Sequence, residues 1–565
     1  MSSPIVECVP NFSEGRDKGI IEATARSISG VAGVALLDVD PGADTNRTVY
    51  TFIGAPEAVA AAALAAAKTA FALIDMSRQS GAHPRMGALD VCPFVPVSGI
   101  DMDACVALSR KVGEDIAREL GVPIYLYEAA ATKPERKSLA FIRSGEYEAL
   151  PTKLANPEWI PDFGPAIFVP SWGATVVGAR EFLIAYNVNL NTRDKKLASE
   201  IACAIREAGG VVKDSAGKPL RDADGKTVKK AGRLKEVRAI GWYIDAYRCA
   251  QVSINLLDHR TTTLHVLFET VKDEAEKRGV LVTGSEIIGV VPLNPMLVAG
   301  RHFLCNMGKS EGASDAELVE TAVRSMGLDA ITTFDPAKRI VEYAGKARAA
   351  LASLSLVDFA DLVSSESPAP GGGSVAALAG SLGAALVAMT ANLTVGKKGH
   401  ETVWKEMSAL AVQAQGIKAA LLAAVDEDTA AFKGIMDAMK LPKATDAQKA
   451  DRGQALRLAY LRATSVPLQS ATVSVDALKL CAAVVERGYP ASVSDAGVGV
   501  LMAKAGLDGS ILNVLINLSQ MKVVNEADAR IASEMRERAK ALAEEGDRLA
   551  KEALTRVRAT MGVNA

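Results

Sequence analysis

The segment 81–94, GAHPRMGALDVCPF, places one of only five histidines between a small-residue turn and an apolar run. His83 precedes Pro84, and a residue before proline is disfavoured in a helix, so we expect its imidazole in a turn or an extended segment. An imidazole with an ordinary pKa can act as a general base near neutral pH. A histidine that only caps a turn explains the local sequence equally well.

Carboxyl groups that can orient an imidazole follow a predicted strand in LLDVDPGADTNR. Asp38, Asp40 and Asp44 lie at the end of that strand or in the loop beyond it, where functional side chains gather. A carboxylate in contact with a histidine base fixes its tautomer and stabilises the imidazolium. An Asx turn before Pro41 is the alternative interpretation.

A second acidic cluster, Asp426, Glu427 and Asp428, interrupts an apolar helical pattern in LLAAVDEDTAAF. Successive helical residues turn by about 100°, so Asp426 and Asp428 point to different faces and at least one can face a helical core. A partly buried carboxyl group can move a proton between two nitrogen atoms. The alternative is an exposed acidic turn of the helix.

The glycines in PAPGGGSVAALAG open a predicted helix. The Lys-Ser/Thr ending and the preceding strand of a nucleotide P-loop are missing, so we reject that interpretation. Gly372 and Gly373 can nevertheless expose backbone N–H groups to a carboxylate or carbonyl of a ligand. A helix start without a ligand remains the alternative.

These groups need a scaffold, and the first part of the chain alternates strand-like and helical segments. Strands are predicted at 5–12, 33–40, 46–54, 90–99 and 123–130, with helices at 16–29, 55–77 and 101–121. A second unit repeats this order from 182 to 292, and the polar segment 214–234 reads as an exposed hairpin or loop. Helices can cover one face of each sheet, as in ferredoxin-like units, so we predict an α+β N-terminal half.

Alanine-rich helical periodicity replaces the strands from about residue 354, which predicts an all-α helical bundle. We therefore expect subdomains at 1–181 and 182–344, a linker at 345–353 and the helical domain at 354–565. A chain of 565 residues is long enough for several such units.

Composition narrows the classes of partner. The net charge of −2 argues against a general nucleic-acid binder and favours small-molecule substrates. Seven scattered cysteines without a CxxC pair suggest a reducing cytoplasm, and no histidine pairs with another metal-type ligand, so we expect no metal. The N-terminus lacks a signal-peptide pattern, and we expect no membrane-spanning segment.

Long motifs through the whole chain resemble the formiminotransferase-cyclodeaminase family. The N-terminal ones are VECVPNFSEGRD, LLDVDPGADTNRTVYTFIG, GAHPRMGALDVCPFVP, PDFGPAIFVPSWGATVVGAREFLIAYNVNL, AIGWY and AQVSINLLD. The C-terminal ones are PAPGGGSVAALAGSLGAAL, LTVGKK, VDEDTAAF, MKLPKAT and NVLINL. The family order is kept, and the insertion near 214–234 is the main segment outside the resemblance.

The resemblance implies a bifunctional folate enzyme of histidine degradation. Its first activity moves a formimino group from N-formimino-L-glutamate to N5 of tetrahydrofolate, and its second closes that adduct to 5,10-methenyltetrahydrofolate and releases ammonia. It further implies two ferredoxin-like subdomains before the helical bundle, tetrahydrofolate, possibly polyglutamylated, as co-substrate, and homo-oligomers built as rings of dimers.

The same resemblance assigns roles to residues. The family's base corresponds to His83, its functional aspartate to Asp40 and its cyclodeaminase acid to Asp428, with Asp426 as a second choice. Arg47 and Arg85 become candidate anchors for substrate carboxylates, since a guanidinium can bind a carboxylate through two hydrogen bonds. Surface salt bridges are the alternative for both.

Further candidates for binding folate lie in three segments. The segment 163–174 matches the family's folate segment, where Trp172 offers an aromatic face or else belongs to the core. The other candidates are Gly164, Pro165, Phe168, Pro170, Ser171 and Gly173 in that segment, Gly372 and Gly373 at the glycine-rich helix start, and Lys397 and Lys398 for the glutamate tail.

Two enzymatic alternatives remain, a formiminoglycine transferase and a methenyltetrahydrofolate cyclohydrolase on the same folds. An alternative of another class is a scaffold that binds folate without turnover.

Overall fold

The computed structural model describes residues 4–43, 45–81, 83–212, 214, 218–222, 225–245, 247–344, 351–521 and 525–563. The predicted loop residue Asp44 and most of the expected linker 345–353 lie outside these residues. The chain divides into two compact units, one of Met1–Ala299 with Ala322–Lys346 and one of Gly300–Thr321 with Ala347–Ala565. Each unit is described by itself.

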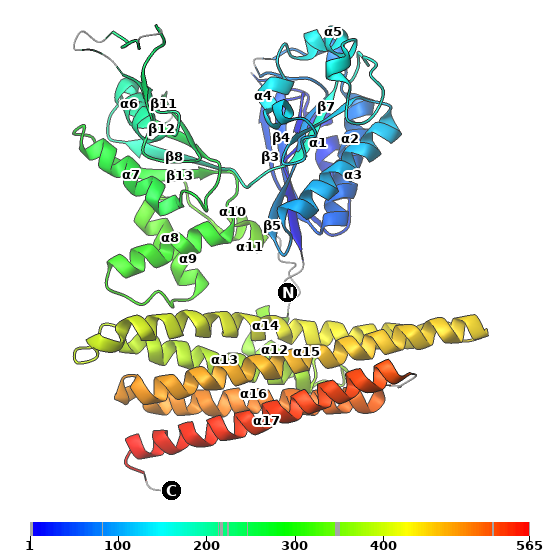
Figure 1. Cartoon of the computed structure of the whole chain (residues 1–565), viewed down its shortest axis with the longest axis vertical. Helices are drawn as coiled ribbons and strands as arrows, with labels where there is room; N and C mark the ends of the chain where they lie inside the picture. The colour runs from blue at the N-terminus through cyan, green and yellow to red at the C-terminus, as the bar shows by residue number, and fades with distance from the viewer. Residues whose placement is uncertain are drawn as a thin grey trace. The chain divides into compact units, whose positions relative to one another are not determined.

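The first sheet is built on a βαββαβ order, β1 (Ile5–Cys8), α1 (Lys18–Ser29), β3 (Val34–Gly42), β4 (Arg47–Gly54), α2 (Pro56–Leu73) and β5 (Leu89–Ser98). These strands lie in the order β3-β4-β1-β5, all antiparallel, which confirms the ferredoxin-like prediction. The short β2 (Asn11–Phe12) pairs with β4 and β5. Figure 1 shows this sheet in blue and cyan with α1, α2 and α3 beside it.

Additional elements extend this first sheet. After α3 (Met102–Leu120), β6 (Ile124–Glu128) and β7 (Thr175–Ala179) join in parallel, with β7 next to β5. The connection between them holds α4 (Leu139–Ile142), α5 (Leu150–Leu154) and short 3-10 turns. Its residues reach back to the His83 segment, as described below.

The second sheet repeats the order with β8 (Ile184–Leu190), α6 (Lys195–Ile205), β11 (Val237–Ile244), β12 (Cys249–Leu256), α7 (Leu264–Glu276) and β13 (Val282–Ile288). The antiparallel order β11-β12-β8-β13 is again ferredoxin-like. Four helices follow: α8 (Leu293–Asn306), α9 (Asp315–Met326), α10 (Pro336–Arg339) and α11 (Val341–Ala344). The extended backbone of Ile340 separates α10 from α11.

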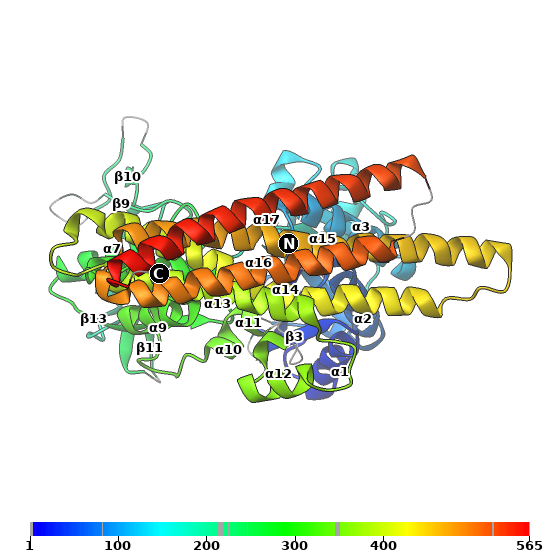
Figure 2. The ribbon, with the colours of Figure 1, turned by 90° about the horizontal axis from the view of Figure 1, so that it is seen from below.

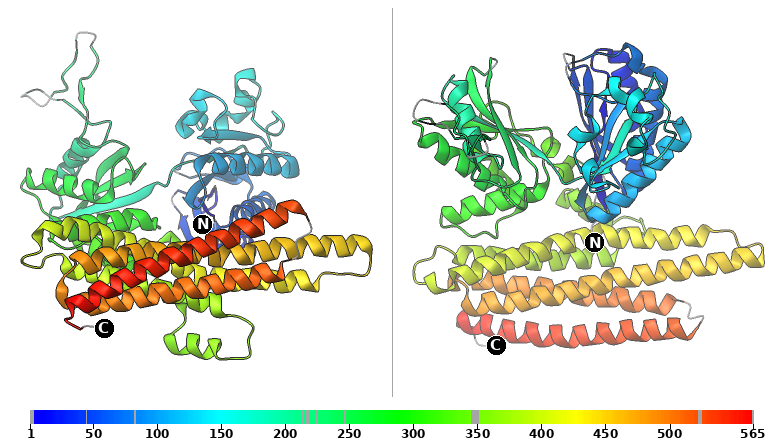
Figure 3. Two further views of the ribbon diagram at one scale, coloured as in Figure 1. Left: turned by 60° about the horizontal axis from the view of Figure 1, so that its bottom comes forward. Right: turned by 45° about the horizontal axis from the view of Figure 1, so that its top comes forward.

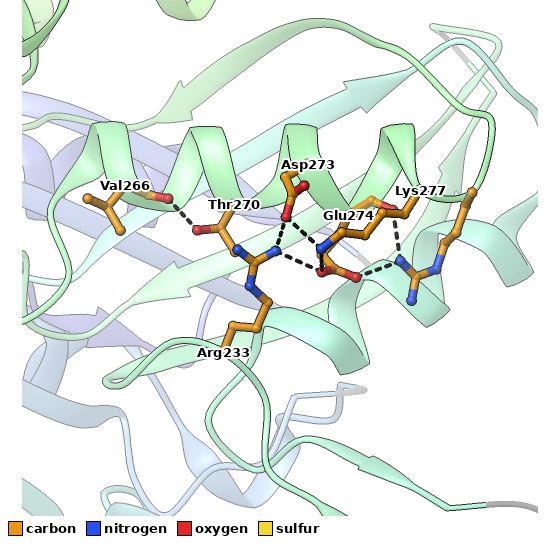
Figure 4. A network of polar contacts seen from close by, with 7 residues as sticks. Arg233, Val266, Thr270, Asp273, Glu274 and Lys277 are labelled. Atoms are coloured by element: carbon orange, nitrogen blue, oxygen red, sulfur yellow. Dashed lines mark hydrogen bonds and ion pairs between the residues drawn. The ribbon is translucent and has the colours of Figure 1, made fainter.

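The insertion after α6 includes a two-stranded hairpin, β9 (Gly210–Val211) with β10 (Lys229–Lys230). Arg233, at the base of the hairpin, forms ion pairs with Asp273 and with Glu274 at 2.7 Å on α7 (Figure 4). Burial tends to raise the pKa of Glu274, but hydrogen bonds from Arg278, Lys277 and Arg233 lower it to about 2. The base of the insertion is thus fixed to the helical face of the second sheet.

The helical unit contains α12 (Leu356–Val363), α13 (Gly372–Thr394), α14 (Trp404–Lys440), α15 (Asp446–Arg487), α16 (Val493–Gln520) and α17 (Glu526–Thr560). The five long helices run side by side (Figures 2 and 3), which confirms the predicted bundle. Small residues bring α13 and α16 into backbone contact, since a Cβ on Gly506 would lie 2.6 Å from the Gly380 nitrogen. Alanines dominate the core between them.

The segment 300–321 belongs to this helical unit. The carbonyl oxygen of Gly312 accepts hydrogen bonds from Asn392 Nδ2 at 2.9 Å and Gln415 Nε2 at 3.0 Å, on α13 and α14. A Cβ on Gly312 would lie 2.2 Å from the Cβ of Ala411, so glycine is required there. Packing therefore assigns residues 300–321 to the helical unit, although the residues before and after them in the sequence belong to the first unit.

Five helical segments among the described residues are long and apolar enough, by length and composition alone, to cross a membrane: Pro56–Leu73, Gly372–Thr394, Glu401–Lys440, Asp446–Arg487 and Pro490–Gln520. Four of them pack around an alanine-rich core within the helical unit, with α13 and α15 contributing the most buried faces. The expectation that the chain does not span a membrane stays a prediction.

Candidate active sites

The loop that carries His83 is held from two sides. On one side Gln79 Nε2 donates to Glu14 Oε2 at 2.8 Å, and Asn46 Nδ2 donates to the carbonyl of Ser80 at 3.1 Å. On the other side the backbone of Gly173 packs so closely that a Cβ there would lie 2.1 Å from the Met86 carbonyl oxygen. The histidine is therefore presented by a fixed backbone.

The polar partner of the imidazole is Arg47, the first residue of β4. Its Nη1 lies 2.8 Å from His83 Nε2. A guanidinium can only donate, so Nε2 accepts and the imidazole is held neutral. Burial first, then the charges of Arg47 and Arg143, lower the pKa of His83 to about 4, which makes the ring neutral at pH 7.

Asp40 lies on β3, where it pairs in register with Val49 of β4. Its carboxylate acts on Arg47, because it raises the arginine's pKa while burial lowers it. Among the described residues, no hydrogen bond or ion pair joins Asp40 to His83. The structure thus places Arg47 between the two groups that the sequence was expected to bring together directly.

Arg85 is already occupied by protein groups. It pairs with Glu146 at 3.4 Å and Glu148 at 2.9 Å, and its Nη2 also donates to the Gln79 carbonyl at 3.0 Å. Its side chain is only 11 % exposed. These contacts tie the loop of Arg85 to the connection before β7, and the role of Arg85 as an anchor for a substrate carboxylate stays a prediction.

The predicted folate segment 163–174 lies against the histidine loop, since Ala88 N–H donates to the Trp172 carbonyl at 2.8 Å. Trp172 itself is fully buried, and its Nε1 donates to Thr175 Oγ1 at 3.0 Å. It therefore cannot present an aromatic face to a ligand, which corrects that expectation. The half-buried Phe168, whose ring lies 5.4 Å from that of Tyr147, keeps an accessible aromatic surface.

The remaining candidates of this segment differ in exposure. Gly164, Pro170 and Ser171 are exposed, and Pro165 is half-buried. Gly164 and Gly173 both have positive φ, at 79° and 82°, so each forms a turn that suits glycine. These residues shape the segment, and their roles in binding stay predictions.

A cavity of about 620 Å³ opens beside Arg47 within the first unit. One wall is the sheet face opposite α1 and α2, with Glu7, Asp38, Asp40, Arg47 and Thr51. The other wall includes Tyr247, Asn255 and Glu286 from the second sheet and its connections and Arg339 of α10, and Arg180, which directly follows β7 of the first sheet, also lines the cavity. Sequence reasoning missed four of these residues, because a lone charged residue in a strand or a short helix carries no motif that local sequence could reveal: Glu7, Arg180, Glu286 and Arg339.

A buried polar network lies next to this second wall. Glu286 accepts hydrogen bonds from Asn187 Nδ2 at 3.1 Å and Gln251 Nε2 at 3.0 Å, and Tyr247 Oη lies 3.4 Å away. Gln251 also donates to Asn189 Oδ1 at 2.6 Å, and the buried Nδ2 of Asn189 has no hydrogen-bond partner among the described residues. This face of the second sheet is polar, and it therefore fits a ligand with many hydrogen-bonding groups.

In the helical unit, Asp428 of α14 lies at the start of α13. Its carboxylate accepts a hydrogen bond from Ser374 Oγ at 3.2 Å, and a Cβ on Gly373 would lie 2.2 Å from its Oδ1. Burial raises the pKa of Asp428, while hydrogen bonds from the Ser374 side chain and backbone lower it less strongly. Asp428 thus lies against Gly373 at the start of α13, directly after Gly372, where its carboxyl group can hold and release a proton.

Asp426 points elsewhere. Its carboxylate accepts hydrogen bonds from the backbone N–H of Leu351 at 2.6 Å and of Ala352 at 3.4 Å, in the short 3-10 helix Leu351–Ser353. This side chain therefore fixes the chain that enters the helical unit, and the contact gives it a structural task distinct from that of Asp428.

Lys397 and Lys398 do not join that cluster. Both follow the C-terminal end of α13, whereas Gly372 begins it, and the helix of 23 residues is about 34 Å long. Lys397 is exposed, with its Nζ 5.1 Å from the centre of the Tyr489 ring. Lys397 and Lys398 thus lie at the opposite end of α13 from Asp428, and their binding of a folate glutamate tail stays a prediction.

Among the residues that the structure describes, no group of three or more histidine, cysteine, aspartate or glutamate side chains could hold a metal ion.

Two ferredoxin-like units that enclose a charged cavity, together with a helical bundle that holds a buried carboxyl group, define a two-part enzyme. Residues 5–180 match the family model of the formiminotransferase domain, N-terminal subdomain, residues 185–346 that of the formiminotransferase domain, and residues 355–541 that of formiminotransferase-cyclodeaminase. The chain is 46 % identical to the formimidoyltransferase-cyclodeaminase of Gallus gallus over 92 % of this chain and 93 % of that protein. The chain belongs to the formiminotransferase-cyclodeaminase family.

Two shorter relatives match the two parts separately. The glutamate formimidoyltransferase of Streptococcus pyogenes serotype M1 is 41 % identical over 53 % of this chain and 93 % of its own length. The methenyltetrahydrofolate cyclohydrolase of Methylorubrum extorquens is 41 % identical over 28 % of this chain and 76 % of its own length.

Proposed function

We propose that the first unit transfers the formimino group of N-formimino-L-glutamate to N5 of tetrahydrofolate, and that the helical unit converts the product to 5,10-methenyltetrahydrofolate with loss of ammonia. Both substrates are small molecules, and tetrahydrofolate is the co-substrate. The observation that carries the proposal is that the two groups this chemistry needs are both present, a neutral imidazole in contact with an arginine that lines a charged cavity and a separate, largely buried carboxyl group.

In the transfer step, N5 of the folate attacks the formimino carbon and His83 takes the N5 proton. The C–N bond to glutamate then breaks, and the proton passes to the departing glutamate nitrogen. A histidine held neutral before reaction has its lone pair ready for this purpose. Asp40 then acts through Arg47 as a positioning residue.

Arg47 couples donor binding to this base. In the substrate-free state its Nη1 is directed at His83 Nε2, the nitrogen that would accept the proton. Arg47 also lines the cavity, so a carboxylate of the donor can draw its guanidinium away. Loss of this cationic neighbour raises the pKa of His83, and the base becomes stronger when the donor is bound.

In the helical unit, N10 of the folate attacks the formimino carbon. Protonated Asp428 gives its proton to the departing nitrogen, and the resulting carboxylate takes the proton of N10. The raised pKa of Asp428 favours the protonated form that the first half of this step requires. Backbone N–H groups near Gly373 can bind a carbonyl or carboxylate of the same ligand.

The direct test is a coupled assay that follows methenyltetrahydrofolate by its absorbance and ammonia enzymatically, starting from formiminoglutamate and tetrahydrofolate. Stoichiometric appearance of both products supports the proposal. Use of formiminoglycine in place of formiminoglutamate would identify a different donor.

A second candidate for the helical unit is hydrolysis of methenyltetrahydrofolate, because a cyclohydrolase matches this part of the chain. An assay with methenyltetrahydrofolate alone separates the two activities. Hydrolysis much faster than ammonia release from 5-formiminotetrahydrofolate would favour the cyclohydrolase.

We also propose that the helical unit associates with a second copy of itself, as the start of a ring of dimers. Exposed apolar side chains lie along α13 and its neighbour α16, namely Val375, Leu382, Met389, Leu393, Val498, Leu501, Leu512 and Ile516. Val375, Leu382 and Met389 are seven residues apart and share one helix face. Mass measurement at micromolar concentration tests this proposal, and a monomer would contradict it.

A cytoplasmic location is proposed from the scattered cysteines, and cell fractionation checks it. Preference for polyglutamylated folate is a further proposal, which a comparison of KM for mono- and polyglutamylated tetrahydrofolate tests.

A further inference from the structure

Three guanidinium groups line the 620 Å³ cavity without an ion pair. Arg47, Arg180 and Arg339 have no carboxylate oxygen within 4.0 Å among the described residues. Three other arginines of the first unit, Arg85, Arg136 and Arg143, instead pair with protein carboxylates. Unpaired guanidinium groups at a cavity are suited to carboxylates that a ligand brings.

The strand register places these three arginines along the cavity. Arg47 is the first residue of β4, while Glu7 lies opposite Ile53 near the other end of that strand. Arg180 lies beside this second end, because its N–H donates to the carbonyl of Phe94, which pairs with Cys8. A strand rises about 3.3 Å per residue, so Arg47 and Ile53, the residue opposite Glu7, are about 20 Å apart along β4.

Arg339 lies near Asp38, whose partner on β4 is between Arg47 and Ile53. It lowers the pKa of Asp38, and Asp38 pairs with Thr51 of β4, about 13 Å along the strand from Arg47. Its Nη1 donates to the Gly289 carbonyl at 2.9 Å, which fixes the guanidinium at the cavity wall. Arg180 and Arg339 therefore lie toward one end of the cavity, and Arg47 with His83 at the other.

Two acids near this pair do not neutralise it fully. Burial raises the pKa of Glu7 to about 7 in spite of the nearby charge of Arg180, and burial also raises the pKa of Asp38. Glu7 is 3 % exposed and lines the cavity, and within the part of the chain that the structure describes no group donates a hydrogen bond to its carboxyl group. Glu7 is therefore only partly ionised near pH 7, and it leaves part of the charge of Arg180 available to a ligand.

We propose that Arg180 and Arg339 bind the glutamate carboxylates at the tail of the folate, while Arg47 binds a carboxylate of the formimino donor. The assignment rests on the proposed transferase function. In formiminoglutamate, one nitrogen and one carbon separate the reacting carbon from the α-carboxylate, so a donor at His83 reaches Arg47 only. In tetrahydrofolate, a methylene, an aminobenzoyl ring and an amide separate N5 from the carboxylates, which suits the far end.

The experiment compares Arg180→Met and Arg339→Met with wild-type protein on two acceptors, tetrahydrofolate and tetrahydropteroate, which lacks the glutamate. A charge-assisted hydrogen bond predicts that each variant raises KM for tetrahydrofolate by about tenfold or more. KM for tetrahydropteroate should not change, nor should KM for formiminoglutamate. Arg78→Met, at an exposed arginine outside the cavity, is the matched control.

An equal rise of KM for both acceptors, or a rise confined to formiminoglutamate, overturns the assignment. Arg180→Lys and Arg339→Lys keep the charge with less disturbance of packing and should show a smaller loss of the same selectivity, so the test holds even if a methionine variant is unstable. Wild-type protein that fails to transfer the formimino group would refute the proposed function. Wild-type activity with unaltered acceptor selectivity in the variants would refute only this inference.

Discussion

Arg47 Nη1 lies 2.8 Å from His83 Nε2, so the nitrogen expected to act as a base is in contact with a cation in the substrate-free protein. The charge of Arg47 is one cause of the low pKa of His83, after burial. We predict that Arg47→Met raises this pKa from about 4 toward the ordinary value of about 6.5.

Nuclear magnetic resonance titration of the imidazole C2 protons checks this shift, with the His83 signal assigned by its loss in His83→Gln. Only five histidines contribute signals. Formimino transfer should fall in the same variant, because the donor loses its carboxylate anchor. A wild-type His83 that titrates near pH 6.5 contradicts the interpretation.

The two candidate sites should fail independently. His83→Gln removes the base of the first unit and should lower formimino transfer by about 100-fold or more, with ring closure of added 5-formiminotetrahydrofolate unaffected. Asp428→Asn should have the reciprocal effect. Steady-state assays of each half-reaction measure both, and a variant that loses both or neither activity would show that the residue is wrongly assigned.

Gly373 tests the geometry around Asp428. A Cβ at this position would lie 2.2 Å from Asp428 Oδ1, so Gly373→Ala should displace the carboxylate and lower cyclodeaminase activity strongly. Gly416→Ala on α14 is the matched control, because no atom lies within 4 Å of its added Cβ. The control should keep its activity and gain about 0.5–1 kcal/mol in free energy of unfolding.

Asp426 should prove structural. Asp426→Asn weakens its hydrogen bonds with the N–H groups of Leu351 and Ala352, and we expect a loss of about 1 kcal/mol in the free energy of unfolding with cyclodeaminase activity retained. Chemical denaturation and the ammonia assay measure the two quantities. Loss of activity at unchanged stability would instead give Asp426 a direct part in the reaction.

Glu7 predicts a pH dependence of stability. Its pKa in the folded protein is about 7, above the ordinary 4.5, so the folded state binds this proton more tightly than the unfolded state. The free energy of unfolding should therefore fall as pH rises from about 4.5 to 7, by up to about 3 kcal/mol from this group. Glu7→Gln should remove that part of the slope in denaturation curves recorded across this range.

More of the fold than of the candidate sites could be predicted from the sequence. Periodicity and turn residues locate the strands of both ferredoxin-like units and the bundle, because each of these signals is local in sequence. The split at Ile340 and the assignment of 300–321 to the helical unit depend on packing between distant residues, which no local pattern records.

The same limit applies to the candidate site residues. His83, Asp428 and Gly373 stand in recognisable motifs, and the structure brings Asp428 and Gly373 together. Trp172 and Arg85 stand in equally recognisable motifs, yet one is core and the other is paired with Glu146 and Glu148. Residue type indicates what a side chain can do, whereas its burial and partners decide whether it is available.

The Gly312 carbonyl, which accepts from both Asn392 and Gln415, has a consequence for dissecting the protein. Cleaving the chain before residue 351 would separate the helical half from a loop that satisfies two of its own side-chain amides. It would also uncover Ala411 where Gly312 now covers it. An autonomous helical fragment must therefore carry 300–321 with it or repack that surface, so the gene for a stable half cannot be designed by dividing the coding sequence at a single point.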